Sequence, residues 1–254
     1  MIGHKYVPSR EGGVEIVVEE LATRMAAQGH EVTLFNRKRK EYPAISEYKG
    51  CKVENIFTVN KRALDAIVYA FCATLKARKL LKRRQVDIVH FHAEGPSFFL
   101  NLLPGKKRRP GTKVVVTIHG LDWQRGKWGG LATRILRAGE RRAVKYADEI
   151  IVLSRNNKTY FREMYHRTTK YIPNGIQPPE LRPAEIIKEK YGLGMNDYIL
   201  FLARIVPEKG LHYLIPAWKK VVEQTGTGKK LVIAGGSSHS DEYYTQICEM
   251  AKGD

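Results

Sequence analysis

The sequence predicts an α/β fold built from parallel sheets and divided into two successive domains. Short runs of β-branched residues alternate with longer stretches of helical periodicity, which is typical of strand–helix–strand units. Several strand candidates are apolar almost throughout, as expected for strands that helices cover on both faces. A proline-rich segment interrupts the alternation at residues 171–183, and the same pattern restarts behind it.

The first domain is predicted over residues 1–172 and contains five clear strands. In chain order they are Glu31–Phe35, Lys52–Phe57, Asp87–His92, Lys113–His119 and Glu149–Ser154. The intervening apolar patterns predict three helices, which cover Val14–Met25, Leu64–Leu75 and Leu131–Tyr146. Only Met1 and Ile2 precede a turn at Gly3, so the initial strand is expected to be very short.

A hinge is predicted at residues 173–183, and the second domain follows over residues 184–254. Four prolines fall between Tyr171 and Pro183, and proline both removes a backbone donor and blocks the continuation of a helix. The predicted elements of the second domain are Ala184–Tyr191 (helix), Tyr198–Ala203 (strand), Gly210–Glu223 (helix), Lys230–Ala234 (strand) and a helix from about Asp241.

The composition is that of a globular protein. Hydrophobic residues make up 43% of the 254 positions and charged residues 28%, which excludes a disordered tail or a fibre. The longest nearly apolar run, Ala66–Leu75, is shorter than the roughly 20 residues that span a bilayer, and no secretory signal is recognised behind Met1. Three widely spaced cysteines predict a reducing cytoplasm, no disulfide framework and no metal site.

The positive charge is concentrated in the first two-thirds of the chain. The formal net charge is +18, and residues 1–175 carry 34 basic against 16 acidic residues, whereas the remainder carries ten of each. This asymmetry indicates an anionic partner. The densest basic stretches are the helix Lys61–Arg84 and the loop Lys106–Arg109. Because no known nucleic-acid motif is present, we favour contact with anionic lipid head groups over nucleic acid, with a solvated helix face as the remaining alternative.

Two glycine pairs follow predicted strands. Gly12 and Gly13 lie between the initial strand and the first helix, where free backbone N–H groups attract anions. An ordinary tight turn also explains this pair, and from these residues alone it is the favoured interpretation. Gly235 and Gly236 repeat the arrangement behind the strand Lys230–Ala234, and that signal is weak by itself.

Histidines end two neighbouring strands of the first domain. Ligands of open α/β sheets bind beyond the carboxyl ends of the strands, and His119 lies at such an end. A substrate-binding role and a hydrogen-bonded strand end are equally compatible with His119. The same two roles remain open for His92, whereas His90 is interpreted as structural.

Two cations of the second domain form a more specific pattern. Arg204 follows the strand Tyr198–Ala203, and Lys209 directly precedes Gly210, where a helix opens. Two cations beside a helix N-terminus can neutralise a diphosphate, Arg through a bidentate fork and Lys as a point charge. The alternative is a solvated surface pair, which this placement makes less favoured.

In combination these motifs resemble the retaining GT-B glycosyltransferases of glycosyltransferase family 4. The resemblance spans nearly the whole chain and rests on GHKYVPSREGGVEIVVEELATRMAAQGHEVTLFNR, VVVTIHGLDWQR, ADEIIVLSR, YIPNGI and ARIVPEKGLHYLIPAW. It implies two Rossmann-like domains with parallel sheets. It also implies transfer of a sugar, with retention, from a UDP- or GDP-sugar to a glycan or lipid-linked acceptor in polysaccharide biosynthesis, without a cofactor or metal.

The resemblance assigns a role to each matching residue. It places Gly12 and Gly13 near the donor diphosphate and His119 beside the transferred sugar and the acceptor. It gives Arg204 and Lys209 the diphosphate itself, and it places Gly235 and Gly236 near the nucleotide base. The enzyme is expected in the cytoplasm, peripheral to the inner face of the cell membrane, with no nucleic-acid partner.

One departure from the family pattern concerns a Glu-x(7)-Glu motif in the second domain. Glu242 and Glu249 lie too early and are too closely spaced to be this motif. We therefore expect the second domain to be incomplete and the chain to be an inactive or weakly active fragment. Two alternatives remain. The first is a GT-B nucleotide-sugar epimerase, for which the first-domain motifs show no pair of carboxylates suited to proton transfer; the second is a non-catalytic basic module that binds nucleic acid or lipid.

Overall fold

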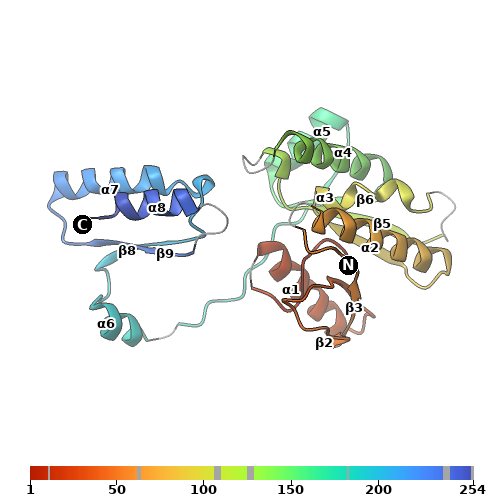
Figure 1. Cartoon of the computed structure of the whole chain (residues 1–254), viewed down its shortest axis with the longest axis horizontal. Helices are drawn as coiled ribbons and strands as arrows, with labels where there is room; N and C mark the ends of the chain where they lie inside the picture. Colours follow the sequence, from red (N-terminus) through yellow and green to blue (C-terminus); the bar gives the residue numbers. More distant parts are fainter. Residues whose placement is uncertain are drawn as a thin grey trace. The chain divides into compact units, whose positions relative to one another are not determined.

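A computed structural model describes residues 1–10, 12–61, 64–105, 110–124, 129–181, 183–236 and 241–252 (Figure 1). The chain divides into two compact units, Met1–Ile176 (unit 1) and Gln177–Asp254 (unit 2). The division falls within the proline-rich segment of residues 173–183. Each unit is an α/β structure with parallel strand pairs, so the predicted fold class is confirmed.

Unit 1 alternates strands and helices along the chain. Its strands are β1 (Thr33–Arg37), β2 (Glu47–Tyr48), β3 (Cys51–Ile56), β4 (Ile88–His92), β5 (Lys113–Ile118), β6 (Glu149–Val152) and β7 (Lys170–Tyr171). Its helices are α1 (Gly13–Ala27), α2 (Asp65–Lys82), α3 (Glu94–Ser97), α4 (Gly130–Tyr146) and α5 (Arg155–Tyr165), with 3-10 turns η1 at Leu100–Leu102 and η2 at Asp122–Gln124.

The strands of unit 1 form one sheet of order β1-β3-β2 and another of order β4-β5-β6-β7. Residues 1–5 lie between them and bond to both. The backbone of Met1 accepts a bond from Phe35 N of β1, and Ile2 exchanges bonds with His90 and His92 of β4. The short initial segment therefore links the two sheets, even though it pairs through a single bridge, Ile2 with Phe91.

The core of unit 1 lies against the strands β4, β5 and β6. Phe91, Val116 and Ile150 are fully buried there, and α2 and α5 contribute Tyr69 and Phe161. Full burial of such side chains contributes roughly 1.5–3 kcal/mol each. Helices pack on the sheet and leave little of it in contact with water. The central strands are therefore largely apolar on both faces.

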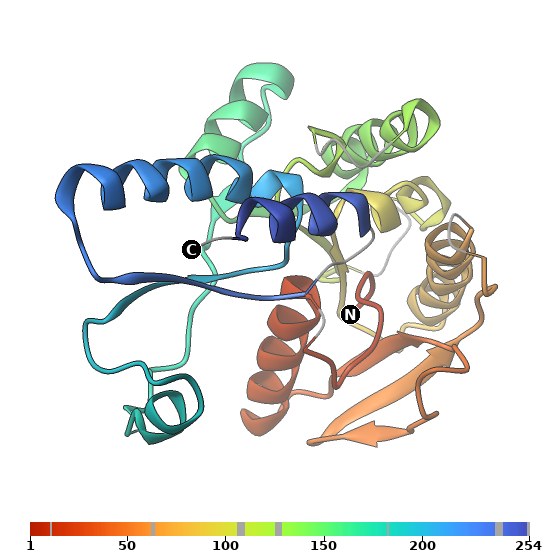
Figure 2. The same ribbon diagram turned by 60° about the vertical axis from the view of Figure 1, so that its left-hand side comes forward.

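Unit 2 contains a parallel strand pair and four helical segments. They are α6 (Glu185–Tyr191), β8 (Tyr198–Leu202), the 3-10 turn η3 (Pro207–Lys209), α7 (Leu211–Thr225), β9 (Lys230–Ala234) and α8 (Asp241–Met250). Helices α7 and α8 lie along one side of the β8–β9 pair in both views (Figures 1 and 2). A small core of Ile205, Leu211, Ile215 and Ile247 joins them.

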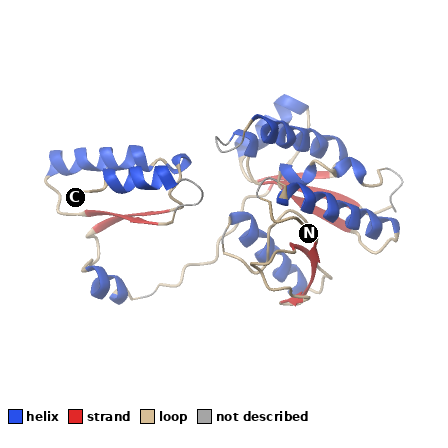
Figure 3. Cartoon of the chain, viewed as in Figure 1, coloured by secondary structure: helices blue, strands red, loops and turns tan. Residues whose placement is uncertain are grey.

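The short elements β2, β7 and α3 of unit 1 were not predicted, and two features differ further from the sequence-based expectation. The first is that β2 runs antiparallel to β3, so not every strand of the chain is parallel (Figure 3). The second is helix α5, which was not predicted because its sequence is polar and only Phe161 is buried. The local signal for α5 was Ser154, whose hydroxyl accepts a bond from Asn157 N as a helix N-cap.

Candidate functional site

The carboxyl end of β5 places His119 at the edge of the sheet. Strand β5 lies between β4 and β6, and His119 follows its last residue, Ile118. The His119 ring is half-buried, and its Nε2 lies 3.1 Å from Nδ1 of His92, the last residue of β4. The parallel register pairs His92 with Thr117, so the two histidines meet because neighbouring parallel strands end together.

His92 lies in a stack of three imidazole rings. Its centroid is 4.2 Å from that of His90 and 5.4 Å from that of His119. His90 Nε2 is 2.7 Å from Thr117 Oγ1, which agrees with a structural role for His90. Burial lowers the pKa of His90 to about 3 and holds that of His92 well below its usual value. Both rings are therefore neutral at physiological pH.

Two buried carboxyl groups hold the segment that follows His119. Oε1 of Glu94 accepts the backbone N–H of Asp122 at 3.1 Å, and Oε2 of Glu140 accepts the indole N–H of Trp123 at 2.9 Å. Both glutamates are completely inaccessible to solvent. Burial, reinforced by the charge of Asp122, raises the pKa of Glu94 to about 8. Residues 119–124 are thus fixed at two points beyond the end of β5.

Glu94 and Asp122 form a carboxyl pair that the sequence analysis did not single out. The sequence motifs of the first domain showed no carboxylate pair suited to proton transfer; in the structure Glu94 lies beside Asp122, and burial together with the charge of Asp122 raises the pKa of Glu94. The pair was missed because 28 residues separate its members, and Glu94 lies outside the quoted motifs although Asp122 lies within VVVTIHGLDWQR. Glu94 is fully buried and bonded to the backbone, so its position suits a role in holding the loop rather than contact with a substrate.

The glycine pair of unit 1 lies at the start of α1. Gly12 is the N-cap of this helix, in extended conformation, and Gly13 is its first residue. A Cβ on Gly12 would collide with the carboxylate of Glu15, whereas the space around Gly13 is open. Glu15 turns back to accept the backbone N–H of Lys5 at 3.0 Å. The N-terminus of α1 therefore has an acidic side chain folded beside it, which the sequence analysis did not single out.

Four predicted residues of unit 2 lie at the carboxyl ends of β8 and β9. Arg204 comes two residues after β8, and Gly235 and Gly236 follow β9 directly. Gly236 accepts a backbone bond from Ile205 at 3.0 Å, which closes the two loops on each other. A Cβ on Gly235 would collide with the carbonyl of Ala203, so only glycine fits this close approach.

Lys209 completes this edge of unit 2. It ends the turn η3, immediately before Gly210, which is the N-cap of α7 and has a left-handed backbone with φ 74°. The side chains of Lys209 and Arg204 are both exposed. Two cations, two glycines and the start of a 15-residue helix therefore share one sheet edge, an arrangement that can bind an anion.

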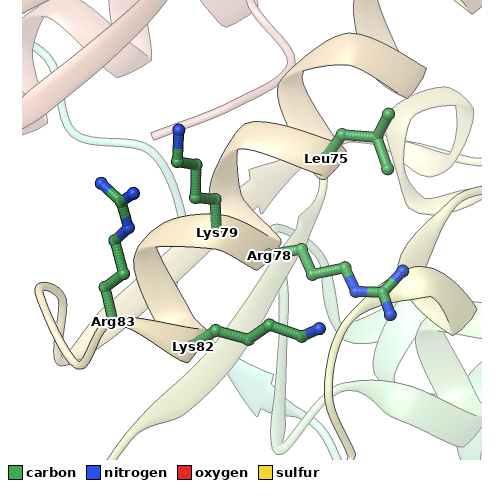
Figure 4. Close-up of a pocket in the computed structure, with 5 residues that line it drawn as sticks. All are labelled: Leu75, Arg78, Lys79, Lys82 and Arg83. Carbon is green, nitrogen blue, oxygen red and sulfur yellow. The ribbon is translucent and has the colours of Figure 1, made fainter.

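The predicted basic helix corresponds to α2. A surface depression of about 360 Å³ lies against its C-terminal half and is lined by Leu75, Arg78, Lys79, Lys82 and Arg83 (Figure 4). Among the described residues these four cations form no ion pair, in contrast to Lys76, which pairs with Glu54. The second predicted basic stretch, Lys106–Arg109, lies outside the described residues.

The described part of the chain contains neither a cluster of metal ligands nor a membrane-spanning helix. No group of three His, Cys, Asp or Glu residues there could hold a metal ion. None of the helices it contains is both long enough and apolar enough to cross a membrane. The three cysteines are free thiols.

Comparison with known families shows which family the chain belongs to. The sequence model of Glycosyltransferase Family 4 matches residues 11–179. The chain belongs to glycosyltransferase family 4. A second model, Glycosyl transferases group 1, matches residues 183–253 of this family 4 chain. The two matches cover unit 1 and unit 2 in turn and confirm the family that the sequence motifs resemble.

Two curated relatives of this family 4 chain have described activities. It is 24% identical over 236 residues to the GDP-mannose-dependent alpha-(1-6)-phosphatidylinositol monomannoside mannosyltransferase of Mycolicibacterium smegmatis, covering 90% of this chain and 59% of the relative. It is 27% identical over 264 residues to the D-inositol 3-phosphate glycosyltransferase of Gordonia bronchialis, covering 94% and 57%. The chain thus spans less than two-thirds of the length of either relative.

Solved structures show the same fold. The HepE protein of Anabaena, solved in complex with UDP and glucose, matches with a TM-score of 0.63 at 16% identity, over 95% of this chain and 62% of that chain. The likeness identifies the fold of the family 4 chain as GT-B, with Rossmann-like units.

Proposed function

We propose that this chain is part of a glycosyltransferase that moves a hexose or similar sugar from a nucleotide-sugar donor, a UDP- or GDP-sugar, to a glycan or lipid-linked acceptor with retention. The observation that carries the proposal is the edge of unit 2, where Arg204, Lys209, Gly235 and Gly236 lie around the start of α7 in a chain of glycosyltransferase family 4. A donor of this kind carries two phosphates, and both cations are exposed.

In this proposal the enzyme acts by holding charge rather than through a cofactor or metal. Departure of the sugar leaves negative charge on the nucleoside diphosphate. Arg204, Lys209 and the N-terminus of α7 stabilise that charge as it develops, which is electrostatic stabilisation of the transition state. Gly235 and Gly236 allow the backbone to approach the nucleotide. No carboxylate nucleophile is assigned, because no residue of the family pattern present here has that role.

Unit 1 supplies the acceptor side in this proposal. His119, fixed at the end of β5 by its contact with His92, lies beside the transferred sugar and the acceptor. Gly12 and Gly13 at the start of α1 provide the loop near the diphosphate. By their names, the two curated relatives act on a phosphatidylinositol monomannoside and on D-inositol 3-phosphate, and the first of these supports a lipid-linked acceptor.

Titration with nucleotide-sugars tests the proposal against the non-catalytic alternatives. The chain is titrated with UDP-glucose, GDP-mannose and a polyanion such as heparin at low and at high salt. Specific donor binding is expected to persist at high salt, whereas binding driven by counterion release falls steeply. Analysis of the reaction products then distinguishes a glycosyltransferase from an epimerase. A glycosyltransferase yields a glycosylated acceptor, whereas only an epimerase yields a nucleotide-sugar with an altered sugar.

We further propose that α2 contacts the anionic inner face of the cell membrane, where the enzyme is peripheral. Phe71 and Leu75 are about 40% exposed, and the cations Lys79, Lys82 and Arg83 follow them along the helix. Apolar and basic side chains on one helix are typical of surfaces that meet lipid head groups. Nucleic acid is not proposed as a partner, because the sequence contains no known motif for it.

A further inference from the structure

Among the described residues, the ring of His92 makes one hydrogen bond. The ring is fully buried at the end of β4, and its Nδ1 is 3.1 Å from Nε2 of His119. Its other nitrogen, Nε2, is buried and has no hydrogen-bond partner among the described residues. A neutral imidazole carries a proton on only one nitrogen. The direction of the hydrogen bond between His92 and His119 therefore determines which nitrogen of each ring is protonated.

Two arrangements satisfy the 3.1 Å contact. If His119 donates, the proton of His92 must lie on Nε2, where a buried N–H would have no acceptor. If His92 donates from Nδ1, the buried Nε2 carries only a lone pair. Buried N–H groups without partners are very rare in proteins, so the second arrangement is favoured. In that arrangement Nε2 of His119 is the acceptor, and the proton of the neutral His119 ring must be on Nδ1.

We infer that His92 is a positioning residue that donates its Nδ1–H to Nε2 of His119 and thereby fixes His119 as the Nδ1–H tautomer. The backbone next to His92 supports such a role. Ala93 has a left-handed conformation with φ 76°, which is strained for a residue with a Cβ, and its N–H donates to Thr117 O at 2.8 Å. Glu94 then accepts the N–H of Asp122. Residues 92–94 therefore hold the segment 117–122 through three consecutive contacts.

The consequence for the reaction rests on the proposed function. A His119 ring in the Nδ1–H form presents a donor at Nδ1, while its Nε2 lone pair is occupied by His92. Such a ring can donate a hydrogen bond to a hydroxyl or phosphate oxygen, but it has no available lone pair for accepting a proton. His119 would then orient substrate oxygens rather than act as a general base.

The tautomer can be measured directly on the 254-residue chain. Long-range proton–nitrogen NMR spectra distinguish the protonated and unprotonated nitrogens of each imidazole, and a His119→Gln variant identifies the signals of His119. We expect His119 in the Nδ1–H form in the wild-type chain at pH 7.5. The Nε2–H form, which free histidine side chains favour in water, would overturn the inference.

Two variants separate the hydrogen bond from the ring stack. His92→Phe keeps an aromatic ring in the stack but removes the donor, so His119 should shift toward the Nε2–H form. His90→Phe is the matched control, because it changes the same stack without touching the contact to His119, and it should leave the tautomer unchanged. A shift of equal size in both variants would also overturn the inference.

Activity provides a second readout. If the chain transfers sugar, His92→Phe should lower kcat by about tenfold with little change in KM for the donor, and His92→Asn, which retains an N–H donor near the position of Nδ1, should restore part of it. The NMR result stands whether or not transfer is observed. Failure of the proposed function and failure of this inference are therefore distinguishable.

Discussion

The indole nitrogen of Trp123 donates a hydrogen bond to Oε2 of Glu140, 2.9 Å away, and this bond ties the segment after His119 to helix α4. The same carboxylate accepts the phenolic hydroxyls of Tyr160 at 2.9 Å and Tyr165 at 2.5 Å, both from helix α5. One buried acidic side chain thus joins the η2 turn, α4 and α5. Hydrogen bonds from these three donors compensate for the cost of burying the acidic group.

Removal of this acceptor should destabilise unit 1. Glu140→Ala leaves three donors of half-buried residues without their acceptor, so we expect the free energy of unfolding to fall by roughly 2–5 kcal/mol. Glu140→Gln retains one carbonyl acceptor and should cost less. Urea unfolding followed by fluorescence measures both. The control is Glu163→Ala on α5, an exposed side chain that should change stability by less than about 0.5 kcal/mol. Equal stability of Glu140→Ala and wild type would contradict the assignment.

Gly139 should not tolerate a side chain. A Cβ at this position would collide with the backbone carbonyl of Glu94, where α3 packs directly on α4. We expect Gly139→Ala to lower stability by about 1–3 kcal/mol or more, since the backbone must move apart. Gly130→Ala, in the first turn of the same helix, is the matched control because its Cβ would meet nothing within 4 Å. Thermal unfolding compares them, and similar melting temperatures for both variants would refute the close approach.

The pH dependence of stability should report on Glu94. Its pKa is about 8 in the folded chain against 4.5 for an ordinary glutamate. The folded state therefore keeps a proton that the unfolded chain releases, and the contribution of Glu94 to stability should decrease as the pH rises from 4.5 to 8. Buried His4, His90 and His92 act in the opposite direction, because their pKa values are lowered, but that contribution is complete above the usual histidine value of 6.5.

Chemical unfolding between pH 6.5 and 8 isolates the carboxyl group from the histidines. Over this range the buried amino group of Met1, whose pKa is lowered to about 5, opposes Glu94, so the wild-type profile should be nearly flat and Glu94→Gln should gain stability relative to wild type as the pH rises. The glutamine keeps an acceptor for Asp122 N, so the loop contact is preserved while the titration is removed. Parallel profiles of wild type and Glu94→Gln in this range would show that Glu94 is ionised in the folded state.

Arg204 should be needed for nucleotide binding. A charge-assisted hydrogen bond contributes about 1.5–3 kcal/mol, so Arg204→Ala should weaken UDP or GDP binding by roughly 10- to 100-fold in calorimetry. Lys220→Ala on α7 removes one exposed positive charge from the same unit away from the sheet edge and should leave affinity nearly unchanged. Equal affinity of wild type and Arg204→Ala for both nucleotides would remove Arg204 from the proposed site.

Binding to anionic membranes should depend on the basic depression of α2 and not only on net charge. Each basic residue near an anionic surface contributes about 1 kcal/mol, so the triple variant Lys79→Ala, Lys82→Ala, Arg83→Ala should largely lose co-sedimentation with anionic vesicles. A triple variant of exposed α4 residues, Arg134→Ala, Arg141→Ala, Lys145→Ala, removes the same charge from another helix. Equal loss in the two variants, or equal binding to neutral vesicles, would contradict a specific surface.

The order of strands and helices was determined by the sequence itself. The apolar run of β5 and the helical face of α1 are local patterns, and a period of two or of 3.6 residues can be read within one segment. The same is true of Arg204, Lys209, Gly235 and Gly236, because the residues that follow parallel strands reach the same sheet edge whatever the rest of the chain does. Strand ends differed from prediction by one or two residues, where hydrogen bonding to neighbours sets the boundary.

Tertiary structure alone decided the surroundings of His119. Glu94 and Asp122 are 28 residues apart, His92 and His119 are 27 apart, and Glu140 and Tyr165 are 25 apart. No local period links such positions, so only packing reveals that these groups meet. Burial then sets their chemistry, because removal of water raises the pKa of Glu94 and keeps His92 neutral. The identity of a histidine at a strand end follows from the sequence, but its proton arrangement depends on neighbours that only the fold brings to it.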